Sequence, residues 1–462
     1  MEKINFEIER KITPLEEAAF GIVRVLQEKG FEAYIAGGAV RDFYLGKDPH
    51  DIDIATSAKP EEVKEIFPSS YDRGKAFGVM AVNIEDFEFE VATFRSDIGI
   101  ADHRRPEKIE FTTAEKDAQR RDFTINALFY DPEKLQIIDF VDGIKDLENK
   151  IVRFVGIPEE RIEEDYLRML RAIRFTYRFE FSLEEKTQKA IIKNASKIGE
   201  ISIERIREEL TLIITGLNRK EALIKLLESG LVKTILPELE KLKGVEQPPE
   251  FHSEGDVLAH TLMAMESLEN PSAELAWTVL LHDIGKPDTQ GFRDHPKSKI
   301  TFFEHDILSA KMTNEILQRL KFSNEFIDSC VWAITQHMRI VHAFQGMSER
   351  KQKKLFTNSH IQLLLDLTKA DLGSSIRPDG QPEIGMYFEA LKKKEQFEKQ
   401  ANEEEKEQLK KFTLITGQDI IEILNITAGP KVGEIKKKIE EAFLEGTIST
   451  REEALKMIED LK

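Results

Sequence analysis

EAYIAGGAVRD, residues 32–42, and DIDIAT, residues 51–56, decide the fold of this chain. The first stretch predicts a buried strand, a tight turn at the glycine pair and a helix from Ala39 to Leu45. The second stretch predicts another strand, from Asp51 to Thr56. Strands and helices are therefore interleaved at the start of the chain.

The glycine turn has the features of a site for a triphosphate. Gly38 has no side chain to block close approach, and the backbone N–H groups at the start of the next helix attract anions. Arg41 can add a bidentate contact to a phosphate. Taken alone, such a turn is more often an ordinary connection between a strand and a helix.

Two aspartates follow the glycine turn at the spacing of one strand face. Asp51 and Asp53 lie two residues apart, so their side chains point the same way, and Glu90 lies in a further predicted strand from Phe87 to Phe94. Carboxylates are hard oxygen ligands that suit Mg²⁺. The order of the turn and the aspartates within about 25 residues favours nucleotidyl transfer.

This combination resembles the head of the class II tRNA nucleotidyltransferases, the CCA-adding family and its poly(A) polymerase relatives in the polymerase-β-like superfamily. The resemblance implies an α+β fold: a polymerase-β-like head, in which helices accompany a mixed sheet, followed by an all-helical neck, HD domain and tail. Residues Arg120, Arg121, Asp122 and Asn126 match the family's second motif, which implies contacts to the ribose and phosphates of a nucleotide. A surface Arg-Arg-Asp at a helix start is the alternative.

Residues 95–106 are polar and interrupted by glycine and proline, which predicts a mobile loop rather than a regular element. The segment resembles the flexible loop that helps the family switch from C to A addition. Family members that add only CC lack this loop, so its presence argues against that subtype. An exposed hairpin tip is the alternative interpretation.

The segment Arg161–Phe175 has helical periodicity, with an apolar stripe of Leu167, Leu170 and Ile173. A solvated, salt-bridged helix is one interpretation. Asp165 and Arg168, however, match the residues with which the family recognises the incoming base. Both C and A present an amino donor beside a ring-nitrogen acceptor, so an Asp acceptor next to an Arg donor selects them against U and G.

Arg161 and Arg171 are further nucleotide-binding candidates in this segment. Downstream, residues 201–210 resemble the family's last neck motif, which we interpret as structural support.

A second constellation is rich in histidine. It resembles the metal-dependent phosphohydrolases of the HD superfamily, and its residues are His260, His282, Asp283 and Asp371 for a first metal site and His305 and His337 for a second ion. Imidazoles and carboxylates on successive helices hold divalent transition metals. The resemblance implies phosphatase or 2′,3′-cyclic phosphodiesterase chemistry at RNA ends. A structural or regulatory HD module, or isolated histidines, are the alternatives.

Composition sets further limits. The chain has 462 residues, enough for two to four domains, and a single cysteine, Cys330, which excludes a disulfide framework. The charged N-terminus has no signal-peptide core, and no apolar run reaches the length of a membrane span. These features predict a soluble, cytoplasmic protein, and they leave its oligomeric state open.

The formal charge of −18 does not exclude a nucleic-acid partner, because binding requires only a local basic stripe. Arginines of the neck are candidates for phosphate contacts. Residues 416–419 and 429–433 resemble the family's tRNA-binding end, although a charged surface helix explains the tail lysines equally well.

We predict four domains: a nucleotidyltransferase head at 1–149, a helical neck for nucleotide and RNA binding at 150–243, an HD domain at 244–388, and a linker with a helical tRNA-binding tail at 389–462. The predicted activity is addition of C and A to the 3′ end of tRNA from CTP and ATP, with Mg²⁺ in the head. The alternatives are an A-adding enzyme that follows a CC-adding partner, a poly(A) polymerase, or chiefly an HD phosphohydrolase.

Overall fold

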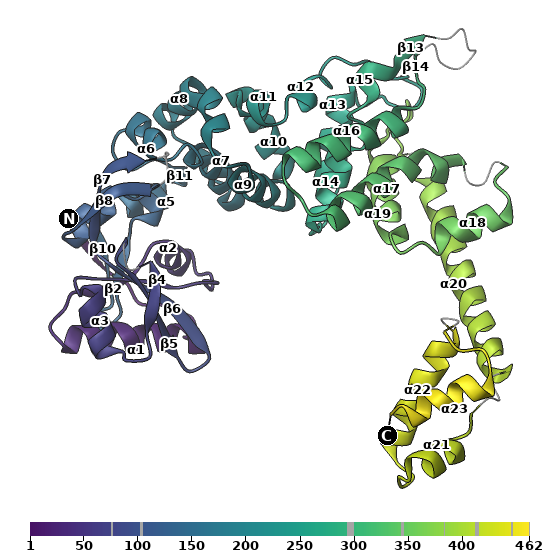
Figure 1. The fold of residues 1–462 in the computed structure, drawn as a ribbon. Coiled ribbons are helices and arrows are strands. Elements are labelled where there is room, and N and C mark those ends of the chain that lie inside the picture. The colour runs from purple at the N-terminus through teal and green to yellow at the C-terminus, as the bar shows by residue number, and fades with distance from the viewer. Residues whose placement is uncertain are drawn as a thin grey trace. The chain divides into compact units, whose positions relative to one another are not determined.

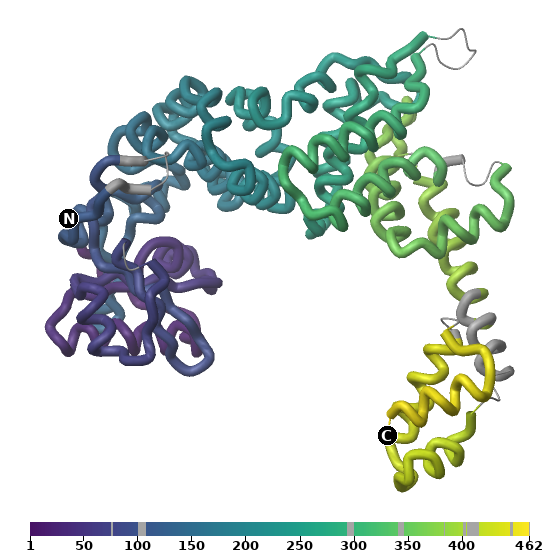
Figure 2. Tube along the Cα trace, in the orientation of Figure 1, coloured from purple at the N-terminus to yellow at the C-terminus, as the bar shows by residue number. Residues whose placement is uncertain are grey.

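The computed structural model describes residues 1–74, 77–101, 105–292, 300–342, 346–382, 384–411, 415–444 and 447–461. The chain divides into two compact units, one of Met1–His337 with Ala370–Glu383 and the other of Met338–Lys369 with Ile384–Lys462. Figure 1 labels the helices and strands, and Figure 2 traces the same chain from its N-terminus to its C-terminus.

The first unit begins with a sheet of eight strands. In spatial order they are β1 (Glu2–Asn5), β10 (Gln136–Asp139), β9 (Phe129–Asp131), β2 (Ala33–Ala36), β3 (Asp53–Thr56), β6 (Phe87–Thr93), β5 (Val79–Ile84) and β4 (Tyr71–Gly74). Only β3 and β6 are parallel neighbours; every other neighbouring pair in this sheet is antiparallel. The central strands are buried and apolar, which explains why they form the core.

The register of the central strands brings acidic residues and the glycine turn together at one end of these strands. Ala36, the last residue of β2, pairs with Asp53, the first residue of β3. Because Ile54 pairs with Val91 in the parallel strand β6, Glu90 lies beside Asp53. The predicted strand from Asp51 begins two residues later than expected, so Asp51 precedes the strand.

Helices cover this sheet and connect its strands (Figure 1). They are α1 (Pro14–Glu28), α2 (Gly38–Tyr44), α3 (Pro60–Ile66), α4 (Ala114–Gln119), the 3-10 helix η2 (Thr124–Asn126) and α5 (Gly143–Glu148). Thr13 caps α1 and forms a capping box with Glu16, and Pro14 occupies the first turn, where it needs no hydrogen-bond partner. The predicted helix 39–45 is confirmed as α2.

The expected mobile loop at 95–106 is wrong for most of its length. Strands β7 (Arg95–Ala101) and β8 (Arg105–Phe111) form an antiparallel hairpin there. Alternating side chains, such as Ser96 opposite Glu110 and Ile98 opposite Lys108, allow the pairing that a composition-based prediction misses. The predicted loop residues Asp102, His103 and Arg104 lie outside the described residues.

The neck is helical apart from the two-residue strands β11 (Ile151–Val152) and β12 (Ser182–Leu183). Its helices are α6 (Pro158–Glu164), α7 (Arg168–Phe179), α8 (Glu185–Asn194), η3 (Ala195–Glu200), α9 (Ile203–Thr215), α10 (Arg219–Ser229), α11 (Leu231–Ile235) and α12 (Pro237–Glu240). The single helix predicted over 161–175 is wrong: the chain leaves the helical conformation at Asp165, whose φ is −156° and ψ is 104°. The apolar stripe of Leu167, Leu170 and Ile173 is nevertheless buried.

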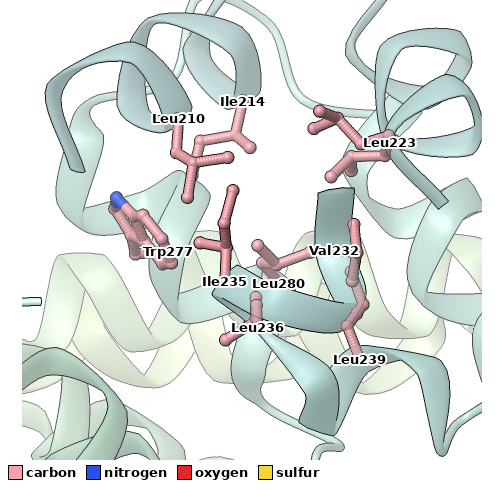
Figure 3. Close-up of a pocket in the computed structure, with 10 residues that line it drawn as sticks. Leu210, Ile214, Leu223, Val232, Ile235, Leu236, Leu239, Trp277 and Leu280 are labelled. Atoms are coloured by element: carbon pink, nitrogen blue, oxygen red, sulfur yellow. The ribbon is translucent and has the colours of Figure 1, made fainter. Parts of the chain in front are cut away.

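The histidine-rich region continues the same unit. Its elements are α13 (Val257–Glu266), α14 (Ala273–Leu281), α15 (Lys286–Thr289), the hairpin β13 (Gln290–Phe292) and β14 (Ile300–Phe302), α16 (His305–Arg319), α17 (Asn324–His342) as far as His337, and α19 (Ile361–Ser374) from Ala370 onward. Figure 3 shows how Leu210 and Ile214 of α9 meet Trp277 and Leu280 of α14 in an apolar core. This shared core makes the neck and the histidine-rich helices parts of one compact unit.

The second unit contains α18 (Glu349–Phe356), α20 (Gly385–Lys411), α21 (Gly417–Leu424), α22 (Pro430–Leu444) and α23 (Arg451–Glu459). The aromatic rings of Phe356 and Phe397 stack between α18 and α20, with 5.9 Å between their centroids. Buried isoleucines, among them Ile420, Ile439 and Ile458, join the last three helices. The charged segment 389–411, at the start of the predicted linker and tail, is helical.

The predicted fold class is confirmed: a mixed sheet with helices in the head precedes a helical remainder. The short pairs β11–β12 and β13–β14 are exceptions to the helical pattern expected after Lys150. Among the described residues, no helix combines the length and the hydropathy that crossing a bilayer requires.

Candidate active site and metal centre

The glycine turn occupies the edge of the sheet between β2 and α2. Gly37 has a φ of +74° and a ψ of −132°, a conformation that residues with a Cβ rarely adopt. A Cβ placed on Gly37 would lie 3.0 Å from Nη1 of Arg121. The turn therefore requires glycine, and it brings the first motif against the second.

A Gly37→Ala variant should lower the free energy of unfolding by about 1–3 kcal/mol, because alanine would be forced into a glycine-only conformation. The measurement is urea denaturation of the purified chain, followed by circular dichroism. Gly21→Ala is the control: Gly21 lies within α1 with open space around it, and alanine there should stabilise by about 0.5–1 kcal/mol. Equal behaviour of the two variants would contradict the assigned role of the turn.

Three carboxylates gather beside the turn. Loss of water around the Asp53 carboxylate, together with the negative charges of Asp51 and Glu90, raises the pKa of Asp53 to about 6, and the nearby Arg121 opposes this shift. Glu90 also forms an ion pair with Arg73, at 3.2 Å. Asp51, Asp53 and Glu90 all retain exposed surface, so a ligand can reach the group. A cluster of like charges of this kind is where a cation binds favourably.

Arg41 lies behind the turn and is almost fully buried. Its Nε donates to Asp42 at 2.9 Å, its Nη1 donates to the Asn126 side chain at 2.5 Å, and its guanidinium lies over the Phe179 ring of α7. These contacts connect the head to the neck. The predicted contact between Arg41 and a phosphate stays a prediction, and it would require some of these contacts to rearrange.

Asp122 links the second motif to the neck segment 161–175. Its carboxylate accepts from Nε and Nη2 of Arg171, at 3.0 and 2.7 Å, and from the amide of Asn126 at 3.3 Å. Burial would raise the pKa of Asp122, but the positive charges of Arg171 and Arg168 hold it below its ordinary value. Asp122 is therefore an ionised acceptor at neutral pH.

Arg120 and Arg121 share one carboxylate that the sequence analysis did not identify. Asp117 of α4 accepts from Arg120 at 2.7 Å and from Arg121 at 3.0 Å, and its side chain is 2% exposed. Spacings of three and four residues along a helix make such pairs possible, so the signal was present in the sequence. Asp117 fixes the direction of both guanidinium groups.

The break between α6 and α7 sets the positions of Asp165 and Arg168. The Asp165 carboxylate accepts from both terminal nitrogens of Arg205, at 3.1 and 2.7 Å. Arg168 pairs with Glu164 at 2.5 Å, and Glu164 also pairs with Arg161 at 2.6 Å. Neighbouring charges thus hold both predicted base-recognition side chains.

Arg205 is the second residue that the sequence analysis missed. It belongs to the segment 201–210 that was interpreted as structural support, and its long-range pair with Asp165 could not be identified from spacing. The three predicted nucleotide-binding segments therefore converge: Arg121 lies at the glycine turn, Asp122 binds Arg171, and Arg168 donates to the carbonyl of Arg120 at 3.4 Å.

The histidine-rich helices bring a second group of side chains together, and all six predicted residues belong to it. Nε2 of His260 lies 3.1 Å from Asp371, and Nε2 of His282 lies 3.2 Å from Asp283. Nε2 of His305 lies 3.5 Å from Asp283 and 3.2 Å from Nε2 of His337. Two subsets that share Asp283 have the close spacing of metal ligands: His260 with His282, and His305 with His337.

The tautomers of these histidines follow from their outer contacts. The Nδ1 atoms of His282, His305 and His337 lie 2.8, 2.9 and 2.6 Å from backbone carbonyls. A carbonyl only accepts, so each Nδ1 carries a proton, and in the neutral ring each Nε2 then presents a lone pair inward. Burial, then the charges of His305 and His282, lower the pKa of His337 to about 4, so His337 is neutral at pH 7.

This set of donors fits a divalent metal ion. The facing Nε2 atoms of His305 and His337 would repel each other without a cation between or beside them, and in the described part of the chain no donor bonds to the buried Nε2 of His282. Burial would raise the pKa of Asp283, but His282 and Lys286 hold it well below its ordinary value. Two carboxylates and four imidazole nitrogens are ligands typical of zinc, manganese or iron.

Glu254 and His252, which the sequence analysis did not consider, stand beside this centre. One carboxylate oxygen of Glu254 lies 3.0 Å from Nδ1 of His260 and 2.7 Å from Nδ1 of His252. Burial would raise the pKa of Glu254, but the hydrogen bonds from His252 and His260 lower it to about 2. The short spacing from His252 to Glu254 was the only available signal.

Comparisons with known proteins agree with this division of chemistry. Residues 33–153 match the family model of the poly A polymerase head domain, residues 180–243 match the probable RNA and SrmB-binding site of polymerase A, and residues 255–372 match the HD domain. Together these three matches define a nucleotidyltransferase that also carries an HD domain.

Proteins with similar sequences and structures identify the family to which the chain belongs. A CCA-adding enzyme of Enterococcus faecalis is 31% identical over 444 residues, which are 94% of this chain and 93% of that protein. A CCA-adding enzyme of Lactobacillus delbrueckii subsp. bulgaricus is 46% identical over 222 residues, so this match spans about half the length of each protein, 48% of this chain and 56% of the relative. The crystal structure of the Bacillus stearothermophilus CCA-adding enzyme in complex with CTP has a TM-score of 0.63 at 26% identity and covers 97% of this chain and 98% of its own.

The chain belongs to the family of CCA-adding enzymes. The family predicted from the two opening motifs is thereby confirmed, as is the HD domain predicted from the histidines.

Proposed function

We propose that this protein adds C and A to the 3′ end of tRNA, using CTP and ATP and releasing pyrophosphate. The observation that carries the proposal is the convergence of three segments far apart in the sequence: the glycine turn with Asp53, the second motif at Arg121 and Asp122, and Arg171 of the neck. Phosphate, sugar and base each have candidate partners within one connected network.

Asp51, Asp53 and Glu90 are the residues that would hold Mg²⁺. The raised pKa of Asp53 supports this assignment, because a bound cation would relieve the repulsion among the three carboxylates. When bound, Mg²⁺ neutralises charge on a transferring phosphoryl group and favours the ionised form of an attacking hydroxyl.

The chain's own residues orient the substrates. Gly37 and Gly38 allow the triphosphate to approach the N-terminus of α2, while Arg120 and Arg121, fixed by Asp117, supply positive charge. The ionised Asp122 can accept from a ribose hydroxyl. The 3′-hydroxyl of tRNA would then attack the α-phosphate, and pyrophosphate would leave.

Asp165 and Arg168 would recognise the base. A carboxylate has about four lone-pair sites, so Asp165 can accept from an amino group of C or A while it remains paired with Arg205. The complex of the B. stearothermophilus relative with CTP supports nucleotide binding in this fold.

The test uses three tRNAs that end before the first C, after the first C and after the second C, each supplied with CTP and ATP separately and together. A CCA-adding enzyme extends all three to CCA and stops. Extension of only the last tRNA would identify an A-adding enzyme, and a long run of A would identify a poly(A) polymerase. No incorporation on any end would contradict the proposal.

A second function is favoured by the four inward lone pairs of the HD histidines. We propose that the HD domain binds a divalent transition metal through His260, His282, Asp283 and Asp371, with His305 and His337 available to a second ion, and hydrolyses phosphoesters at RNA ends. Such a metal, when bound, lowers the pKa of a coordinated water. Metal-dependent hydrolysis of a 2′,3′-cyclic phosphate by the native chain, absent in Asp283→Asn, is the expected result.

The four-domain division at 1–149, 150–243, 244–388 and 389–462 is part of this proposal. The head would carry out nucleotidyl transfer, the neck would bind the substrates, the HD domain would hydrolyse phosphoesters, and the tail would contact tRNA. A cytoplasmic location is also proposed, and the lone buried thiol of Cys330 suits a reducing compartment.

A further inference from the structure

The buried carboxylate of Glu254 has no place in the ligand set described above, yet it contacts that set directly. Its side chain is 1% exposed, and one of its oxygens, Oε1, lies 3.0 Å from Nδ1 of His260. Burying an ionised carboxylate costs folding free energy unless hydrogen bonds or opposite charges compensate it. The partners of Glu254 therefore indicate why a carboxylate is kept at this position.

The geometry fixes the tautomer of His260. An ionised carboxylate only accepts, so Nδ1 of His260 carries a proton, and in the neutral ring the lone pair therefore lies on Nε2, which is 3.1 Å from Asp371 in the centre. The other three histidines of the centre use backbone carbonyls for the same purpose. Among the histidines of this centre, His260 is thus the one that a charged side chain orients.

The second oxygen of Glu254 contacts the backbone of the segment that follows α19. It accepts from the backbone N–H of Ile376 at 2.9 Å, and the neighbouring Ser253 donates to the carbonyl of Ile376 from its backbone, at 2.8 Å, and from its hydroxyl, at 2.9 Å. Ile376 follows the end of α19, which carries Asp371. One carboxylate therefore connects His260 to the segment that follows the helix of Asp371.

We propose that Glu254 is a positioning residue of the HD metal centre, which orients His260 and holds it in register with Asp371. The inference rests on the proposed metal binding by this domain. A carboxylate behind a ligating histidine raises the basicity of the ligand and restricts the rotation of its ring. The role requires no direct contact between Glu254 and the metal.

The test compares Glu254→Gln with the native chain in the full-length protein. Glutamine keeps the size and one acceptor but loses the charge and presents an amide donor toward Ile376. We expect the affinity for Mn²⁺, measured by competition with a chelator, to fall about 10- to 100-fold. The absorption spectrum of the Co²⁺-loaded chain should also change, because that spectrum reports the ligand geometry.

Glu250→Gln is the matched control, since Glu250 is an exposed glutamate in the same segment, and this variant should bind metal as the native chain does. Thermal unfolding without metal shows whether Glu254→Gln folds, and His252→Ala, which removes only the second donor to Glu254, should weaken binding less than Glu254→Gln.

Three outcomes decide between the claims. Native affinity and spectrum in a folded Glu254→Gln would overturn the positioning role. If His252 and Glu254 themselves bind a metal ion, that ion is lost in both variants while the ions of the other histidines remain. This result would also overturn the positioning role of Glu254. If the native chain binds no metal at all, the proposed HD function fails instead.

Discussion

Asp53→Asn should reduce nucleotide incorporation into tRNA by about 10³-fold, because an amide neither neutralises nor holds a divalent cation as a carboxylate does. A factor of this size corresponds to roughly 4 kcal/mol of transition-state stabilisation. The measurement is the single-turnover rate of CTP addition at saturating Mg²⁺. Asp53 is suited to this test because it begins β3 beside the glycine turn, and because burial and the charges of Asp51 and Glu90 raise its pKa to about 6.

The matched control is Asp86→Asn, since Asp86 is an exposed aspartate in the turn between β5 and β6. It should retain the native rate. Metal binding by the HD histidines should survive in both variants, because that centre lies on other elements of the chain. Native incorporation by a folded Asp53→Asn would place the reaction away from this edge of the sheet.

Asp165→Asn should relax the choice of base without a comparable loss of rate. The native carboxylate of Asp165 only accepts hydrogen bonds, so it has no donor for the carbonyl that U or G presents. The side-chain amide of an asparagine can donate to that carbonyl. We expect the ratio of kcat/KM for CTP to that for UTP to fall about 10- to 100-fold, which corresponds to about 1.4–2.7 kcal/mol and is the size of an unsatisfied group in a buried pairing. The ratio is read from competition between the two nucleotides on one tRNA.

Glu163→Gln serves as the neighbour control: it lies two residues from Asp165, and its side chain is 66% exposed. It should keep the native ratio. An unchanged ratio in Asp165→Asn, with native folding, would show that the pair of Asp165 and Arg205 supports the neck rather than reading the base.

Patterns within short stretches of sequence predicted the helices and strands that depend only on neighbouring residues. The strand before Gly37, the helix after it and the strand of Asp53 follow from apolar runs and a glycine pair, and the structure has all three. The HD domain was also predicted correctly, because His282 and Asp283 end an apolar helix in a distinctive way, and its six predicted residues lie together; their role as metal ligands stays a prediction.

Tertiary contacts decided what the patterns missed. A composition rich in glycine and polar residues indicates a loop, yet hairpin pairing from Arg95 orders most of that segment. Helical periodicity continues through Asp165, but the carboxylate pairs with Arg205, 40 residues away, and the helix is interrupted there. Glu254 was missed for the same reason, since its partner Ile376 is 122 residues distant.

The two ion-pair networks also explain why single motifs are weak predictors. Arg120 and Arg121 depend on Asp117 for their direction, and Arg171 depends on Asp122. The pairs of Asp117 follow a local helical spacing, but no spacing rule for one motif includes a partner in the next motif, as Asp122 is for Arg171. The convergence of these motifs in three dimensions is the property that separates a nucleotide site from a charged surface.

The most direct measurement is a crystal structure of the chain with Mg²⁺ and a non-hydrolysable CTP analogue. We expect an arrangement in which a metal ion joins the triphosphate to Asp51 and Asp53, and in which the amino group and ring nitrogen of the cytosine face Asp165 and Arg168. A triphosphate bound away from the two aspartates, or a base directed away from Asp165 and Arg168, would contradict it.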